Sequence, residues 1–121
     1  MEVLAARIRI AMNGRDMDAF RSLIAEDARW GEDPNALETC HSRNDIIATY
    51  KRLLAEGVRG TVTETMVGPR GVACHLEVEW PGPEHRGRGA SFYQVFLVQE
   101  GVVTEIEGHD DETLALAAIS S

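Results

Sequence analysis

The sequence carries little positive charge, and lysine is almost absent from it. Lys51 is the only lysine, 12 basic residues stand against 20 acidic ones, and the formal net charge is −8 at pH 7. Proteins that bind DNA or RNA neutralise phosphates with clustered lysine and arginine. The charge balance therefore argues against nucleic acid as a partner and favours an acidic, well-solvated surface.

Long apolar runs are also missing. No stretch approaches the roughly 20 apolar residues that a membrane-spanning helix requires. Residues 1–4 lead directly into an amphipathic pattern, without the basic leader of a signal peptide. We therefore expect a cytoplasmic protein with no membrane partner.

Cysteine is scarce as well. The two cysteines, Cys40 and Cys74, do not have the spacing of a metal site, and two free thiols are expected rather than a disulfide. The sequence also lacks a P-loop, a dinucleotide-binding fingerprint, a nucleophile elbow and zinc-ligand spacing. No cofactor and no metal are expected.

The remaining composition is typical of one globular domain. The chain has 121 residues, of which 44% are hydrophobic and 26% are charged. A chain of this length buries roughly two-thirds of the surface that its unfolded form exposes, so it needs neither a metal nor a disulfide to fold. We expect a single domain over residues 1–121.

Apolar residues at helical spacing predict two helices at the start of the chain. The first covers residues 2–12 and ends at Asn13 and Gly14, because both residue types tolerate positive φ. The second covers about residues 17–25 and follows Asp16, which is a good N-cap.

A third helix is the clearest element of the sequence. Ser42 and Asp45 form a capping box in which Asp takes the place of the usual Glu. The apolar stripe that follows ends at Gly57, which suits the position after a helix. This helix carries Tyr50 on its apolar stripe.

Residues near 27–31 form a short extended segment. After Gly60 the spacing of apolar residues changes from the 3.6-residue period of a helix to the two-residue period of a strand. Four strands are expected over residues 61–67, 71–80, 91–99 and 102–108. Asp110 or Asp111 then caps a short C-terminal helix. Short links between consecutive strands predict an antiparallel sheet, and three preceding helices predict an α+β fold with helices packed on one face.

The strand at 91–99 is apolar on both faces. Phe92 and Phe96 lie on one face, and Val95 and Leu97 lie on the other. A strand of this kind is covered on both sides. Because the three helices cover only one side, we expect a homodimer through the open face of the sheet.

Four segments carry motifs of a known family. They are Asn-x-x-Asp-x-x-Ala-aromatic over residues 13–20, Leu-x-x-x-Asp-Ala-x-aromatic over 23–30, a His-Gly-Arg-Glu-Glu-like helix start over 41–45 with Ser42 in place of Gly, and a closing hairpin over 94–106. In this order, they resemble the nuclear transport factor 2-like superfamily, and in particular its SnoaL-like branch.

The resemblance implies a cone-shaped, curved antiparallel sheet with three N-terminal helices on its concave face, a cystatin-like roll that encloses an apolar pocket. The superfamily includes ketosteroid isomerases, polyketide cyclases, epoxide hydrolases, dehydratases and pure binding modules, so fold does not select an activity. One reading is cofactor-free proton transfer on a small apolar or aromatic molecule, of isomerase, cyclase or dehydratase type. The alternative is a non-catalytic ligand-binding or dimerisation module.

Three residues of the helical half are candidates for the ligand pocket. Trp30 matches an aromatic that the family tends to place at the pocket, and the alternative is that it packs in the core. Tyr50 is either a core anchor or a pocket donor, because a buried tyrosine usually finds a partner for its hydroxyl. Phe20 is the third residue of the helical half that we expect at the ligand pocket.

The strands contribute the other candidates. His75 and Tyr93 are further pocket candidates, although alternation also allows His75 to lie on the sheet surface. His109 and Asp110 follow the last strand, near the acidic acid–base residue of SnoaL-type cyclases, and are the candidate catalytic pair. The alternative is that His109 packs and a neighbouring Asp only caps the last helix.

Overall fold

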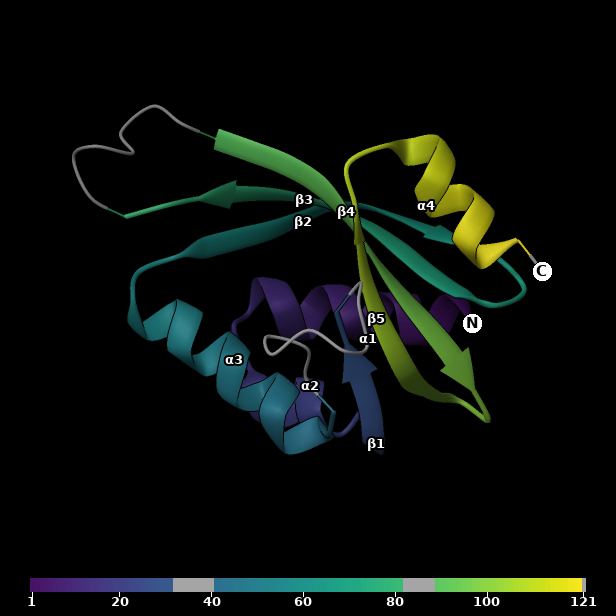
Figure 1. The fold of residues 1–121 in the computed structure, drawn as a ribbon, viewed down its shortest axis with the longest axis horizontal. Helices are drawn as coiled ribbons and strands as arrows, with labels where there is room; N and C mark the ends of the chain where they lie inside the picture. The colour runs from purple at the N-terminus through teal and green to yellow at the C-terminus, as the bar shows by residue number, and fades with distance from the viewer. Residues whose placement is uncertain (32–40, 82–88, 121) are drawn as a thin grey trace.

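The computed structural model describes residues 1–31, 41–81 and 89–120 (Figure 1). Its elements in chain order are α1 (Glu2–Asn13), α2 (Met17–Arg21), β1 (Ile24–Trp30), α3 (Arg43–Ala55), β2 (Arg59–Val67), β3 (Gly71–Glu79), β4 (Gly89–Gln99), β5 (Val102–His109) and α4 (Glu112–Ile119). The expected α+β order of helices followed by strands is confirmed.

One five-stranded sheet organises the fold, with the strand order β1-β5-β4-β3-β2. The consecutive strands β2 to β5 pair antiparallel, as predicted from their short connections. β1 joins the edge beside β5 and runs parallel to it, with Ile24 opposite Val103. Local patterns do not reveal this pair, because its two strands lie at opposite ends of the sequence.

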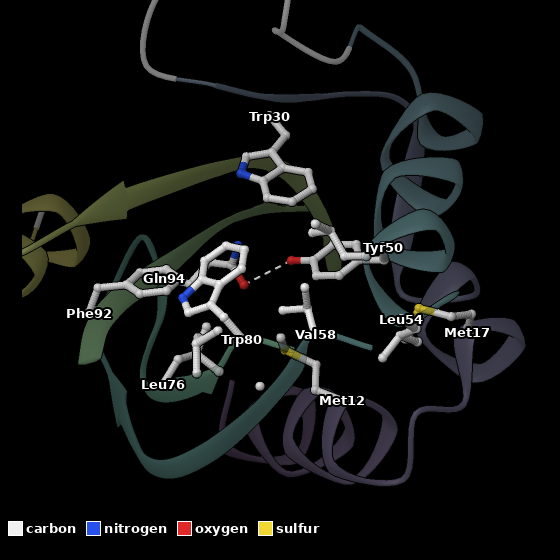
Figure 2. Close-up of a pocket in the computed structure, with 13 residues that line it drawn as sticks. Met12, Met17, Trp30, Tyr50, Leu54, Val58, Leu76, Trp80, Phe92 and Gln94 are labelled. Carbon is white, nitrogen blue, oxygen red and sulfur yellow. Dashed lines mark hydrogen bonds between the residues drawn. The ribbon is translucent and has the colours of Figure 1, made fainter. Parts of the chain in front are cut away.

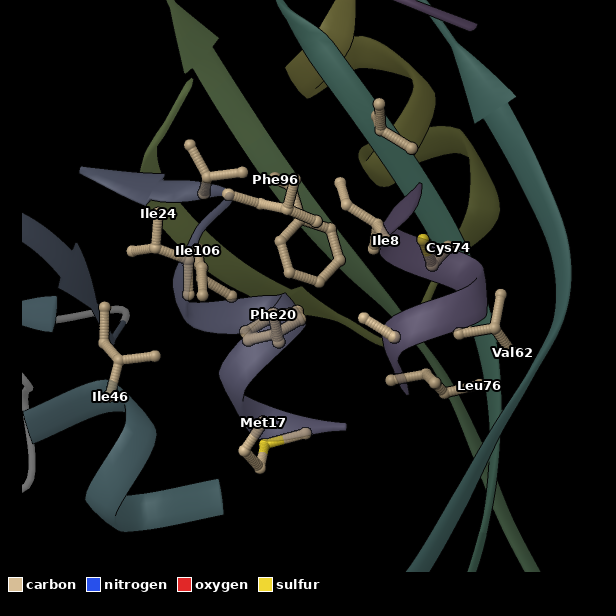
Figure 3. Close-up of a cluster of buried hydrophobic side chains, with 14 of the residues drawn as sticks. Ile8, Met17, Phe20, Ile24, Ile46, Val62, Cys74, Leu76, Phe96 and Ile106 are labelled. Atoms are coloured by element: carbon tan, nitrogen blue, oxygen red, sulfur yellow. The ribbon is translucent and has the colours of Figure 1, made fainter. Parts of the chain in front are cut away.

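Helices α1, α2 and α3 cover the inner face of the sheet (Figure 1). Figure 3 shows the core that they form with it, in which Phe20 of α2 meets Phe96 of β4 edge to face, with ring centroids 6.0 Å apart. Both rings are fully buried. Burial of side chains of this size contributes most of the favourable free energy of folding.

The outer face is covered in part by α4, which corrects one premise of the sequence analysis. Ala115 and Ile119 of this helix pack with Val95 and Leu97 of β4 in a second buried cluster. The chain's own C-terminal helix therefore accounts for the apolar outer side of β4. No second copy is needed to cover that part of the strand.

The ends of the helices follow the capping signals in most places. The Ser42 hydroxyl accepts a hydrogen bond from the Asp45 backbone N–H at 3.2 Å, and Gly57 adopts a φ of +93° after α3. After α1 it is Arg15 that has a positive φ, of +55°, while Gly14 has a φ of −81°. The bond to Ser42 confirms the predicted start of α3.

The second helix is shorter than predicted. It ends at Arg21, and β1 already begins at Ile24. Leu23, in the turn before β1, and Ile24, its first residue, are buried as they would be in a helix. An apolar pair of this kind cannot distinguish the two conformations, which is why the pattern overextended the helix.

Two hydrogen bonds of the Asn13 side chain join the end of α1 to β2, which is an edge strand of the sheet. Its amide nitrogen donates to the Val62 carbonyl at 3.1 Å, and its amide oxygen accepts from the Val62 N–H at 2.7 Å. The strand register shifts between Val62 and Glu64, so the contact lies at an irregular position of the sheet. The Asn13 amide thus satisfies backbone groups that an edge strand leaves open.

We predict that Asn13→Ala lowers the free energy of unfolding by about 1–3 kcal/mol, because it leaves the Val62 N–H and carbonyl without partners. Chemical denaturation would measure the change. Asn44→Ala, at an exposed position of α3, is the control and should change stability by less than about 0.5 kcal/mol. Equal effects of the two substitutions would contradict this role for Asn13.

Cys74 lies on the inner face of β3 and is fully buried, with a free thiol. Burial raises the pKa of Cys74 from 9.0 to about 12, and the positive charge of Arg9 offsets only part of this effect. The unfolded thiol ionises at lower pH than the folded one, so its contribution to stability is lost as pH rises from about 9 to 12. Cys40 lies outside the described residues.

We predict that the Cys40→Ser variant, in which Cys74 is the only thiol, does not react with a thiol reagent at pH 8 while folded. The same protein should react once denaturant is added, without prior reduction, because the thiol is enclosed only in the native state and because its thiolate fraction rises when the pKa returns from about 12 to 9.0. Absorbance of the released reporter measures the reaction. Fast labelling of the folded variant would contradict the buried position.

Candidate functional site

An apolar cavity of about 130 Å³ lies between the helices and the inner face of the sheet. A single buried water needs about 10–15 Å³ of such space, so the cavity is larger than one water site. Figure 2 shows the cavity. Its lining residues are Met12, Met17, Trp30, Tyr50, Leu53, Leu54, Val58, Gly60, Leu76, Val78, Trp80, Phe92 and Gln94.

Helical and strand periodicity bring these residues together. Tyr50, Leu53 and Leu54 lie on one stripe of α3, because residues three and four apart share a helix face. On β4, Phe92 and Gln94 point inward because residues two apart share a strand face. One wall of the cavity is therefore helical and the facing wall is sheet.

Aromatic rings form the wall between β1 and α3. The Trp30 and Tyr50 rings stack with centroids 4.7 Å apart and an angle of 16° between their planes. Tyr50 also meets Phe20 edge to face at 5.1 Å. Each of these geometries is favourable for aromatic pairs and limits how far the rings can turn.

The only hydrogen bond drawn in this cavity joins its two walls (Figure 2). The Tyr50 hydroxyl donates to Oε1 of Gln94 at 2.8 Å. Gln94 is 3% exposed and is the one buried polar residue in the described part of the chain. Among the described residues, the lining contains no Asp, Glu, His, Lys or Arg.

Two of the sequence-predicted pocket residues line this cavity, namely Trp30 and Tyr50. Tyr50 combines both roles considered for it, because it packs against Phe20 and also donates a hydrogen bond at the cavity. Phe20 is 1% exposed and lies in the core behind Tyr50 rather than among the lining residues. Its large ring supports the cavity wall from behind.

His75 and Tyr93 are not among the residues that line this cavity, and their assignment to a ligand pocket stays a prediction. They lie opposite each other on β3 and β4, with ring centroids 4.9 Å apart. Because Gln94 faces inward, its neighbour Tyr93 faces the outer side of the sheet, where it packs beside α4. The Nδ1 atom of His75 is hydrogen-bonded to the Thr63 hydroxyl at 2.6 Å.

The phenol of Tyr93 titrates above its ordinary range. Desolvation, followed by the negative charges of Glu112, Glu64 and Asp111, raises the pKa of Tyr93. The phenol therefore stays protonated at neutral pH.

His109 and Asp110 also lie away from the cavity. His109 is opposite Tyr93 on β5 and therefore shares its outer face, where Nε2 lies 3.0 Å from Oε2 of Glu107. Asp110 is exposed, and Asp111 caps α4 by accepting from the Thr113 N–H at 2.6 Å. The catalytic roles assigned to His109 and Asp110 stay a prediction.

Sequence reasoning missed two prominent lining residues. Gln94 was overlooked although it lies between Phe92 and Phe96 on the same strand face, so strand periodicity already placed it inward. Trp80 follows β3 and lines the cavity while remaining 44% exposed. The signal that could have identified Gln94 was a single amide on an otherwise apolar strand face.

No cluster of three or more His, Cys, Asp or Glu side chains within residues 1–31, 41–81 and 89–120 is arranged to hold a metal ion. In the same ranges, no helix has the length and apolar character to cross a membrane.

The geometry agrees with a known family. A family model for the SnoaL-like domain matches residues 5–106. The chain belongs to the SnoaL-like domain family. This confirms the resemblance seen in the sequence, and the helices, curved open sheet and inner cavity are the fold that this resemblance implied. No curated protein matches the sequence.

Solved structures show where this SnoaL-like domain stands in fold space. A provisionally assigned ketosteroid isomerase from Kribbella flavida DSM 17836 has 23% identity and a TM-score of 0.70 over 91% of this chain and 76% of that chain. A provisionally assigned polyketide cyclase from Sinorhizobium meliloti has 18% identity and a TM-score of 0.69 over 90% and 95% of the two chains. TerC, co-crystallised with polyporic acid, has 15% identity and a TM-score of 0.70 over 98% and 95%. At these identities the likeness is one of fold.

Proposed function

We propose that this SnoaL-like domain binds a small, uncharged, mainly apolar or aromatic molecule in the cavity between α3 and the sheet. The observation that carries the proposal is the lining, in which aromatic, aliphatic and thioether side chains surround a single carboxamide. Apolar cavities with a few convergent polar groups are typical ligand sites. TerC, a protein of the same fold, was co-crystallised with polyporic acid, which supports a small organic ligand for this fold.

The electrostatics of the lining favour an uncharged ligand. Moving a charge from water into an apolar site costs several kcal/mol unless a partner of opposite charge is present. The described lining offers no such partner. The ligand's affinity then depends on its apolar surface and on contact with the Trp30–Tyr50 stack.

Binding is favoured over proton transfer by the same residues. A general base must come within hydrogen-bond reach of the proton that it removes. Of the described lining residues, only Tyr50 and Gln94 form a polar pair, and their hydrogen bond joins them to each other. Isomerase, cyclase or dehydratase chemistry through His109 and Asp110 is the second candidate, and the fold's relatives are its support.

Tryptophan fluorescence tests the proposal, because both tryptophans line the cavity. Steroid-like, terpenoid and polyaromatic probes should quench the Trp30→Phe and Trp80→Phe variants with the same dissociation constant, since each retains one indole at one site. Trp30→Ala should weaken binding roughly tenfold or more, because it removes an aromatic face of the cavity.

His109→Ala is the matched control, since this side chain lies on the outer face of the sheet. It should leave the dissociation constant unchanged. If no probe of the panel quenches either single-tryptophan variant, the proposed function is wrong. Dissociation constants that differ between the two variants would mean that the tryptophans report on separate sites.

The homodimer stays a prediction, and α4 removes part of its basis by covering the outer side of β4. His75 and Tyr93 are still half-buried on the same face and form the surface that a second copy would meet. Sedimentation at micromolar concentration should then give about twice the chain mass of 13.3 kDa. A single species at the chain mass would contradict the dimer.

A further inference from the structure

The Asn13-Gly14 pair combines a reactive sequence with a restrained structure. In such a pair the backbone nitrogen of glycine can attack the asparagine side chain, because glycine has no side chain to hinder the approach and few conformational limits. Asn13 is the only asparagine of the sequence that precedes a glycine, since the other two precede alanine and aspartate. Asn13 is therefore the asparagine of this chain that is most prone to deamidation.

Water is the only other reactant that deamidation requires. The Gly14 nitrogen loses its proton to solvent and forms a bond to Cγ of Asn13. The Cγ–Nδ2 bond breaks with its electron pair on Nδ2, which takes a proton from solvent and leaves as ammonia. Water then opens the cyclic succinimide, either at Cγ to give aspartate or at the main-chain carbonyl to give isoaspartate. Either product adds a negative charge to the chain.

The folded structure holds both reacting groups apart. The Gly14 N–H donates to the Ile10 carbonyl at 2.9 Å, so its proton is already engaged. The Asn13 amide is turned toward β2, where Nδ2 donates to the Val62 carbonyl at 3.1 Å and Oδ1 accepts from the Val62 N–H at 2.7 Å. These bonds must break before Cγ of Asn13 can reach the Gly14 nitrogen. The reaction therefore requires local opening of the contact between α1 and β2.

We propose that Asn13-Gly14 is a modification site, at which deamidation permanently alters those chains in which the end of α1 has separated from β2. The aspartate product has no Nδ2 donor for the Val62 carbonyl and sets a carboxylate oxygen against it. In the isoaspartate product the main chain runs through Cγ and the carboxylate is attached directly to Cα, so it is too short to reach β2. The two original hydrogen bonds cannot form again in either product.

The contact between Asn13 and Val62 adjoins the candidate site. Met12 directly precedes Asn13, and Gly60 lies two residues before Val62 on β2. Both Met12 and Gly60 line the apolar cavity. Release of the α1 end therefore changes the part of the cavity wall that α1 and β2 form.

The first test measures the rate of deamidation at pH 8 in native protein and in the same protein unfolded by guanidinium chloride. Trypsin cleaves after arginine and lysine, so peptides 10–15 and 44–51 each contain one asparagine, and mass spectrometry follows both. In denaturant, Asn13 should react faster than Asn44, which precedes aspartate. In native protein, Asn13 should react at least about tenfold more slowly than in denaturant, because only the open fraction of chains can react.

Hydrogen exchange of the Val62 amide measures the opening itself, since its partner is Oδ1 of Asn13. Small additions of denaturant, below the unfolding transition, should raise the Val62 exchange rate and the Asn13 deamidation rate by the same factor. This comparison uses the wild-type chain alone, so it does not depend on whether a variant folds.

The second test uses the modified protein, which anion exchange separates by its additional negative charge. Its Val62 amide should exchange at least about tenfold faster than that of unmodified protein, because its partner is lost. The methyl resonance of Met12 should shift as the wall of the cavity changes.

Three results would overturn the inference. Asn13 that deamidates no faster than Asn44 in denaturant is not a preferred site. Equal rates in native and unfolded protein, or a native rate that does not follow Val62 exchange, would mean that the contact with β2 does not control the reaction. Unchanged Val62 exchange and an unchanged Met12 resonance in the modified protein would show that the product leaves α1 in place.

Discussion

The alternation of side chains along β4 is the constraint on which the rest of the structure depends. β4 is the middle strand of the sheet, with layers packed against both of its faces. Gln94 and Phe96 face the three N-terminal helices, whereas Val95 and Leu97 face α4. A shift of one residue would exchange the two sets, burying aliphatic residues in place of the amide and removing the polar group from the cavity.

The hydrogen bond between Tyr50 and Gln94 then links the helical and the sheet wall of the cavity. Tyr50 comes from α3 and Gln94 from the sheet, so their contact fixes the position of the helix relative to the strand. Stacking on Trp30 holds the Tyr50 ring at the side of the cavity rather than in its centre. An open apolar cavity costs stability, because its lining loses packing contacts. A bound ligand would raise the free energy of unfolding again, and a ligand of higher affinity would raise it more.

Much of this arrangement could be predicted from periodicity and capping, and the rest depends on contacts distant in sequence. Strand alternation placed Phe96 on one face and Val95 on the other, and the capping box placed the start of α3 after Ser42. The parallel pairing of β1 with β5 and the docking of α4 have no local signal, because each joins segments far apart in the chain. The candidate site was incomplete because Gln94 is a lone amide within an apolar pattern, and its partner Tyr50 lies on another element.

The sheet also separates two kinds of chemistry. The histidines His75 and His109 lie on the outer face with Tyr93, while the cavity on the inner face has a neutral lining among the described residues. Proton transfer requires the base and the substrate to be within hydrogen-bond distance. Because His109 shares the outer face with Tyr93, its side chain points away from the cavity. The apolar inner cavity and the outer histidines are therefore two separate surfaces of the molecule.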